Sequence, residues 1–118
     1  MENPKIEWIT ISGQKCLKFT FAEKLNGLDA REAVDKWKKY CDSASGNKII
    51  LIWDCLEMQG YDPEARNVWQ NALKDLKTKI ENIFVITNSS LIKMGTMAMS
   101  MFASYKMKVV GSIDEIKL

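Results

Sequence analysis

The stretch that decides the fold lies near the middle of the chain, where residues 53–66 read WDCLEMQGYDPEAR. An apolar run at residues 49–53 leads into it, and such runs are typical of a strand covered on both faces of a parallel sheet. Asp62 and Pro63 mark the start of a helix, because aspartate suits the N-cap and proline the first helical position. We therefore expect residues 56–62 to form a strand-to-helix loop, which is where parallel α/β proteins usually bind ligands and partners.

The bulk composition is that of an ordinary globular domain. The chain has 118 residues, of which 47% are hydrophobic and 27% charged, and we expect a single domain over residues 1–118. The net charge of +2 is too small to indicate a nucleic-acid partner or an anionic membrane. The N-terminus lacks the apolar run of a signal peptide, and the run at residues 49–53 is much shorter than the ~20 residues of a membrane span. These features favour a cytoplasmic protein.

Side chains for catalysis and metal binding are scarce. The chain contains no histidine, which excludes Ser-His and Cys-His nucleophiles and removes the commonest metal ligand. Cys16, Cys41 and Cys55 form no C-x-x-C motif, and their odd number suits reduced thiols in a cytosol. No glycine-rich phosphate loop occurs, and the carboxylates at residues 54–64 do not have the spacing of a calcium loop. We therefore expect a protein that is not an enzyme and has no cofactor or metal site.

Turn signals and hydrophobic spacing predict an alternation of strands and helices. The Asp29–Glu32 pair has the form of a capping box at the start of the first helix, which follows a loop at residues 26–28 and ends near residues 43–46. The order implies a mixed, mostly parallel sheet with helices packed on it. The expected elements are strands 6–11 and 16–21 in a hairpin, strand 48–55, a helix from 63, strand 83–87, helix 91–105, strand 108–110 and a short helix or turn at 112–116.

A family resemblance rests on two aspartates. Asp54 comes directly after the apolar strand, and Asp62 follows eight residues later. With the element order, they make the whole chain resemble the STAS domain, the fold of bacterial anti-sigma factor antagonists and of the cytoplasmic tails of anion transporters. In the antagonists the second aspartate is followed by two hydroxyl residues and a glycine, and a partner kinase phosphorylates one of those hydroxyls. Here Pro63, Glu64 and Ala65 occupy these positions. The resemblance thus implies the fold, while the phosphorylation switch lacks its hydroxyl.

A divergent, SpoIIAA-like branch of this family also lacks the serine and looks like the CRAL-TRIO lipid-binding fold. The runs at residues 66–69 and 91–95 are similar to such members. The resemblance implies a regulatory protein partner, such as an anti-sigma factor or another STAS-like protein, or self-association as a homodimer. The alternative that it leaves open is the binding of a lipid-like or other apolar small molecule.

The expected third helix, residues 91–105, carries more apolar surface than one sheet face requires. At about 100° per residue its apolar side chains sweep over half of the circumference, whereas a helix packed on one face needs a stripe nearer to about 100° wide. Only Lys93, Thr96, Ser100 and Ser104 gather on the remaining side. Three explanations for the excess apolar surface remain open. It is buried between neighbouring elements, it forms a partner or dimer interface, or it forms the wall of an apolar ligand pocket.

The candidate contact surface combines the expected loop with the third helix. Binding residues concentrate on loops held by rigid strands, although simple loop packing explains the same side chains. Glu64 suits the first turn of a helix, because a negative charge there interacts favourably with the helix dipole. It also occupies a position at which the antagonists carry a hydroxyl that can be phosphorylated, and its carboxylate supplies part of the charge of a phosphate. Met97 and Met101 would supply an apolar anchor, because methionine suits adaptable contact surfaces. The candidate contact residues are Met58, Tyr61, Asp62, Glu64, Arg66, Met97 and Met101.

Overall fold

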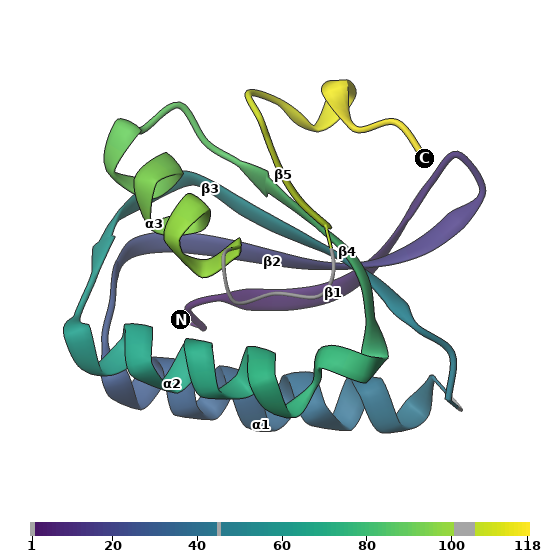
Figure 1. Ribbon diagram of the computed structural model, residues 1–118, viewed down its shortest axis with the longest axis horizontal. Helices are drawn as coiled ribbons and strands as arrows, with labels where there is room; N and C mark the ends of the chain where they lie inside the picture. Colours follow the sequence, from purple (N-terminus) through teal and green to yellow (C-terminus); the bar gives the residue numbers. More distant parts are fainter. Residues whose placement is uncertain (1, 45, 101–105) are drawn as a thin grey trace.

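The chain folds into one five-stranded sheet with three helices, as seen in the computed structural model (Figure 1), which describes residues 2–44, 46–100 and 106–118. The sheet order is β1-β2-β3-β4-β5, with β1 antiparallel to β2 and the remaining pairs parallel. The elements are β1 (Lys5–Ile11), β2 (Gln14–Leu25), α1 (Gly27–Ser43), β3 (Ile49–Tyr61), α2 (Pro63–Asp75), the 3-10 turn η1 (Lys77–Lys79), β4 (Ile80–Ile86), α3 (Ser90–Ser100), β5 (Lys106–Val110) and the 3-10 turn η2 (Ile113–Glu115).

The expected N-terminal hairpin is confirmed, and its turn explains its register. Ser12 and Gly13 both have positive φ values, 51° and 79°, which is the conformation of a two-residue turn matched to the twist of the strands. Ile11 therefore lies opposite Gln14, and Trp8 lies opposite Leu17. The hairpin places β2 between β1 and β3, where Leu17 and Phe19 are fully buried.

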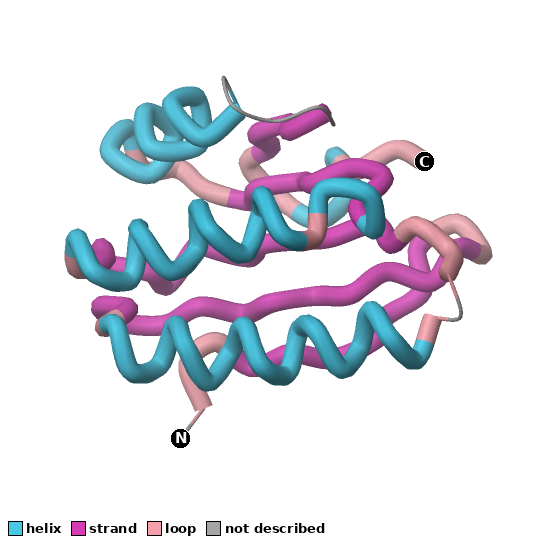
Figure 2. The backbone as a smooth tube through the Cα atoms, turned by 60° about the horizontal axis from the view of Figure 1, so that its bottom comes forward, coloured by secondary structure: helices cyan, strands magenta, loops and turns pink. Residues whose placement is uncertain are grey.

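All three helices pack on the same face of the sheet (Figure 2). Alternation along the strands sends Leu17, Leu51 and Val85 toward the helices, while Ile50 and Phe84 point to the opposite face. On that opposite face a smaller cluster is closed by Ile116 from the C-terminal segment. The central strands are therefore covered on both sides, as their unbroken apolar sequence predicts.

Five aromatic rings fill the space between the sheet and the first two helices. Trp37 of α1 is fully buried and lies 5.3 Å from Phe19 and 5.4 Å from Trp69, measured between ring centroids. Trp53 and Phe21 complete the cluster, and most of the pairs meet edge to face. This aromatic cluster fixes the positions of α1 and α2 against β2 and β3.

The predicted start of the first helix is wrong by about one turn. α1 begins at Gly27, and Asn26 is its N-cap, because the Asn26 side chain accepts a hydrogen bond from the backbone N–H of Asp29 at 2.8 Å. Asparagine is among the best N-cap residues, so it satisfies the free N–H groups before Asp29 is reached. The expected capping box from Asp29 to Glu32 is therefore replaced by this earlier cap, and residues 27–28 are helical rather than loop.

The largest correction concerns residues 56–62, which were expected to form a loop. β3 continues to Tyr61 because β2 also continues, to Leu25, and the two extensions pair in parallel from Ala22 opposite Glu57 to Leu25 opposite Tyr61. One register shift precedes this pairing, between Thr20 and Ala22, and a second lies within it, between Glu23 and Lys24. Irregularities of this kind, such as β-bulges, bend a strand without ending it. The decisive sequence stretch is therefore a bent strand that leads directly into α2.

The remaining boundaries follow the predicted order with small shifts. β4 begins at Ile80, earlier than the expected strand at residues 83–87, and β5 spans Lys106–Val110 rather than only residues 108–110. α3 is described as far as Ser100, so the expected end of the helix at residue 105 lies outside the described residues. In the described part of the chain, no helix is both long and apolar enough to cross a membrane.

Candidate functional site

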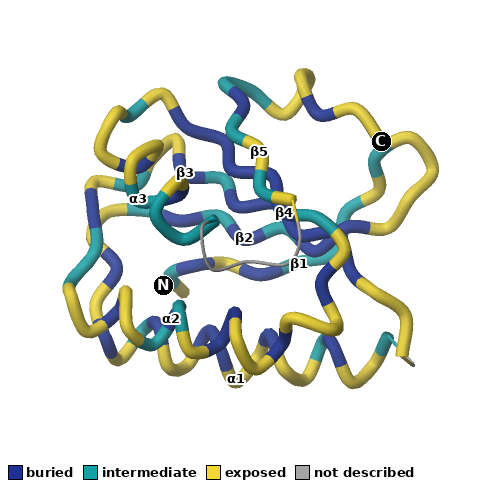
Figure 3. The backbone as a smooth tube through the Cα atoms, viewed as in Figure 1, coloured by how far each residue is buried: buried dark blue, intermediate teal, exposed yellow. Residues whose placement is uncertain are grey.

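The first feature of the site is the apolar outward face of α3. Leu91, Met94 and Met97 expose 60%, 68% and 66% of their surface, whereas Ile92 and Thr96 are buried. Figure 3 shows exposed segments along α3. We call the exposed side chains Leu91, Met94 and Met97 the α3 surface. Exposed apolar groups on one helix face differ from the scattered single residues that most protein surfaces carry. The α3 surface is therefore the first candidate for contact with a partner.

The predicted polar side of this helix is wrong at Thr96, which faces the core. Its hydroxyl donates a hydrogen bond to the backbone carbonyl of Ile92 at 2.9 Å, so the buried polar group has a partner within its own helix. The absence of a side chain at Gly95 lets the Tyr61 hydroxyl come close, because a Cβ there would overlap the phenolic oxygen. The small Gly95 and the internally hydrogen-bonded Thr96 thus allow α3 to pack on this side, while Met94 and Met97 remain exposed.

A small apolar cavity lies beneath α3, between this helix, α2 and the ends of β2 and β3. Its volume is about 50 Å³. Its walls include three candidate contact residues, Met58, Tyr61 and Arg66, which the structure thus brings together at one site. The other walls are not among the candidate contact residues, and they include Phe21, Leu25, Ala65, Trp69, Ile92, Thr96 and Met99.

The two acidic candidates, Asp62 and Glu64, do not line the cavity but form ion pairs within the chain. Asp62 is the N-cap residue of α2 as predicted, but its side chain makes no cap hydrogen bond and lies 3.0 Å from the Lys24 ammonium. Glu64 pairs with the guanidinium of Arg31 and lies against Gly27, where a Cβ would overlap its carboxylate. These exposed pairs join the start of α2 to β2 and α1, so the negative charges of Asp62 and Glu64 are neutralised locally.

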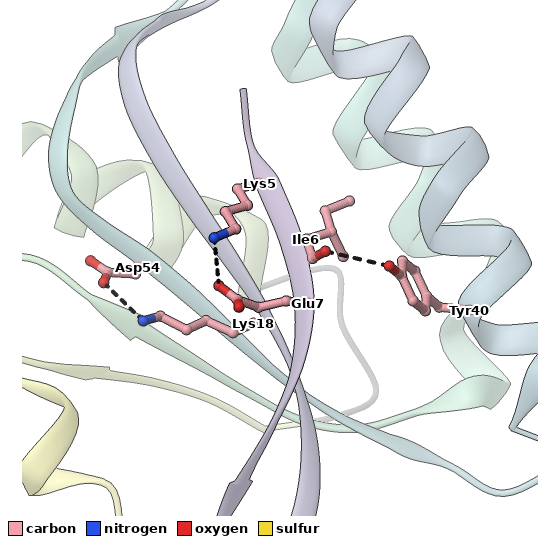
Figure 4. Close-up of polar contacts among 6 residues, drawn as sticks. All are labelled: Lys5, Ile6, Glu7, Lys18, Tyr40 and Asp54. Atoms are coloured by element: carbon pink, nitrogen blue, oxygen red, sulfur yellow. Dashed lines mark hydrogen bonds and ion pairs between the residues drawn. The ribbon is translucent and has the colours of Figure 1, made fainter. Parts of the chain in front are cut away.

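Asp54, the first aspartate of the family pattern, lies away from Asp62. It is half-buried on the sheet face opposite the helices, 3.8 Å from the Lys18 ammonium (Figure 4), and it accepts a hydrogen bond from the N–H of Leu56 at 3.2 Å. The same view shows the Tyr40 hydroxyl donating to the carbonyl of Ile6 and the Lys5–Glu7 pair on β1. Asp54 therefore has a local structural role at the point where β4 stops pairing with β3.

The remaining candidates divide between exposed and undescribed positions. Met97 belongs to the α3 surface, and Pro63 is the first residue of α2 as expected. Met101 lies outside the described residues. Over residues 2–44, 46–100 and 106–118, no three or more side chains of the His, Cys, Asp and Glu types gather as metal ligands would.

Cys55 lies in the wall of the cavity, and burial raises the pKa of its thiol from 9.0 to about 12, with a smaller contribution from the nearby Asp54 charge. The folded state therefore holds this proton at pH values where the unfolded chain has lost it. Between pH 9 and the raised pKa, stability must fall as pH rises.

We expect the free energy of unfolding to decrease above about pH 9, with Cys55 contributing a slope of up to about 1.4 kcal/mol per pH unit. Urea unfolding at a series of pH values would measure it. The matched control is Cys55→Ala, which removes this titration. Cys16 and Cys41 remain in the variant, and burial raises the pKa of both thiols as well. Equal slopes in the wild type and in Cys55→Ala would contradict the prediction.

A mixed sheet with an N-terminal hairpin, three helices on one face and strands in chain order is a SpoIIAA-like fold. Among solved structures, the chain is similar to an uncharacterized protein of the DUF3478 family from Shewanella loihica PV-4, which is described as having this fold. The TM-score is 0.83 over 98% of this chain and 91% of that one, at 14% sequence identity. No protein-family model and no curated protein matches the sequence. The expected STAS-type, SpoIIAA-like α/β fold is thus confirmed, and the likeness concerns the fold alone.

Proposed function

We propose that this chain is a non-catalytic regulatory module that works through protein–protein contacts at the α3 surface. The observation that carries the proposal is the outward position of Leu91, Met94 and Met97, three apolar side chains exposed on one helix. Methionine side chains are flexible and polarizable, so they suit a surface that must adapt to a partner. The cavity beneath the same helix adds a recess at which a contact can be anchored.

The family resemblance supports the kind of partner. An anti-sigma factor or another STAS-like protein would be regulated by the presence of this chain rather than by its phosphorylation, because Pro63 and Glu64 offer no hydroxyl. The ion pair between Glu64 and Arg31 supports the same reading, since it leaves little net charge for a partner to recognise at that position. The module would then remain in one binding state.

A variant carrying Met94→Asp and Met97→Asp should keep its fold, because both side chains are mostly exposed. We expect it to retain at most about a tenth of the partner that the wild-type chain captures, since charged groups within an apolar contact must be desolvated. Crosslinking in the native cell, with mass spectrometry to identify the crosslinked protein, measures the capture. Light scattering after gel filtration measures self-association in parallel.

The matched control is the double variant Leu28→Asp and Ile113→Asp, which makes the same chemical change at exposed apolar residues of α1 and η2. It should capture the partner as well as the wild-type chain does. If the α3 double variant binds the same partner with unchanged yield, the α3 surface is not the contact site and the proposal fails.

The alternative from the sequence, an apolar small-molecule binding protein, has one supporting observation, which is the apolar lining of the cavity. Ligand pockets of small molecules usually enclose about 300 Å³ or more. The cavity measures about 50 Å³, so it fits an acyl chain or a similar ligand poorly. The small volume of the cavity therefore favours the proposed protein–protein contact over small-molecule binding. A lipid retained by the chain in native mass spectra would favour small-molecule binding instead.

A further inference from the structure

We propose that the partner inserts one aliphatic side chain into the cavity beneath α3 and places a carboxylate against Arg66. The inference rests on the proposed function and specifies the chemistry of the partner segment. It would be an amphipathic segment whose apolar anchor stands next to aspartate or glutamate. Three features of the described residues support it: the size of the cavity, its lining, and the distribution of charge around α3.

The size of the cavity corresponds to a single side chain. A volume of about 10–15 Å³ on the same measure holds one water-sized group. The cavity of about 50 Å³ therefore accepts about four such groups, which is the number of carbon atoms in the side chain of leucine. Interfaces commonly gain most of their affinity from a few anchors that fill pockets of this kind.

The lining of the cavity selects an apolar anchor. Phe21, Trp69, Ile92 and Met99 provide carbon and sulfur surface, and the Thr96 hydroxyl in the wall already donates to the carbonyl of Ile92. An aliphatic side chain would lose no hydrogen bonds on entering, whereas a polar one would have to give up its contacts with water. The same argument disfavours a charged anchor inside the cavity.

The charge around the site selects an acidic neighbour for that anchor. Residues 82–113 contain no aspartate or glutamate, although they contain Lys93, Lys106 and Lys108. Arg66 lines the cavity and is exposed, and within the described part of the chain neither it nor Lys93 forms an ion pair. A carboxylate on the partner can therefore reach an arginine that has no competing partner in its own chain.

The same charges make a second copy of this chain a poor occupant. In a symmetric pair formed through this face, each residue meets the corresponding surface of the other copy. Arg66 and Lys93 would then face a surface whose α3 and β5 segments carry lysine and no carboxylate. Like charges brought together in this way oppose association. A flat lipid surface also fits less well, because it cannot fill a recess behind the helix.

Selection from a displayed library of random peptides against the wild-type chain tests the proposal. The enriched peptides should share a large aliphatic residue with aspartate or glutamate beside it. Their binding should weaken by about tenfold or more on Arg66→Glu, which reverses the charge, and on Ala65→Leu, which fills the cavity from α2. Lys74→Glu is the matched control, because Lys74 is exposed on the same helix away from the cavity and should leave binding unchanged.

The variants need a check of folding, because Ala65 is buried. If Ala65→Leu unfolds at a lower temperature than the wild type, Thr96→Leu, which narrows the same cavity from α3, takes its place. The inference would be overturned if the enriched peptides lacked an acidic residue. It would also be overturned if they bound the cavity-filling variant and the Arg66→Glu variant as tightly as they bind the wild type.

Two further outcomes separate this inference from the proposed function. Peptides that depend on Met94 and Met97 but are insensitive to the Arg66 and Ala65 changes leave the α3 surface as a contact site and overturn the anchor. The second outcome is that no peptide is enriched and that the wild-type chain sediments with phosphatidylcholine–phosphatidylglycerol vesicles, whereas the Met94→Asp and Met97→Asp variant does not. This result would assign the α3 surface to a bilayer and overturn both proposals.

Discussion

Replacing Trp37 with alanine is expected to lower the free energy of unfolding by about 3–5 kcal/mol, which is the usual cost of deleting a large buried aromatic side chain. Trp37 is fully buried and touches Phe19, Trp53 and Trp69 in the aromatic cluster. The cavity left by the indole cannot be refilled by its neighbours, since rings on both the sheet and α2 define its walls. Urea unfolding followed by tryptophan fluorescence and circular dichroism would measure the loss.

The matched substitution is Trp37→Phe, which keeps an aromatic ring in the cluster. The indole N–H of Trp37 is buried and has no hydrogen-bond partner among the described residues, so phenylalanine removes a donor that costs about 1–3 kcal/mol to leave unsatisfied. We expect Trp37→Phe to be much less destabilising than Trp37→Ala. Equal losses for the two variants would mean that ring packing contributes little at this position.

Replacing Gly60 with alanine is the second substitution with a large expected effect, about 1–3 kcal/mol of destabilisation. Gly60 has a φ of 155°, a conformation that L side chains rarely adopt, and it pairs with Lys24 directly after a register shift between β2 and β3. Among the described residues, no atom outside residues 59–61 lies within 4 Å of the position where a Cβ would stand. The loss would therefore come from backbone strain and not from a steric clash.

D-Alanine at position 60, introduced by chemical ligation, is the sharpest control for that prediction. It adds the same methyl group but prefers positive φ values, so it should preserve stability where the L-residue reduces it. Urea midpoints at constant m-value compare the two chains. If both forms lose the same free energy, the space around Gly60 rather than its φ value explains the effect.

The sequence predicts the order of elements because turn chemistry and apolar runs are local. Ser12-Gly13, the run at residues 49–53 and Pro63 each place a turn, a buried strand or a helix start without help from distant parts of the chain. The extension of β3 to Tyr61 is different, because it depends on β2 pairing with it beyond the bulges. No pattern within residues 56–61 alone reports that a second strand will lie alongside them.

The orientation of α3 shows why the candidate site could be predicted only in part. When apolar residues cover more than half of a helix, the sequence does not say which part of that arc turns inward. Here the choice depends on Gly95 beside the Tyr61 hydroxyl and on the internal hydrogen bond of Thr96, and both are properties of the packed structure. The sequence predicts Met97 as a contact residue, but it does not distinguish Leu91 and Met94 from the other apolar residues of the helix.

The order of the strands in the sheet has a consequence for the way the chain folds. Each strand pairs with the strand that precedes it in the sequence, so no strand has to enter between two that are already joined. The sheet can therefore grow from the N-terminal hairpin by one helix and one strand at a time, in the order in which a ribosome releases them. The α3 surface and β5 follow the first four strands, so this apolar surface is completed only after most of the core that supports it.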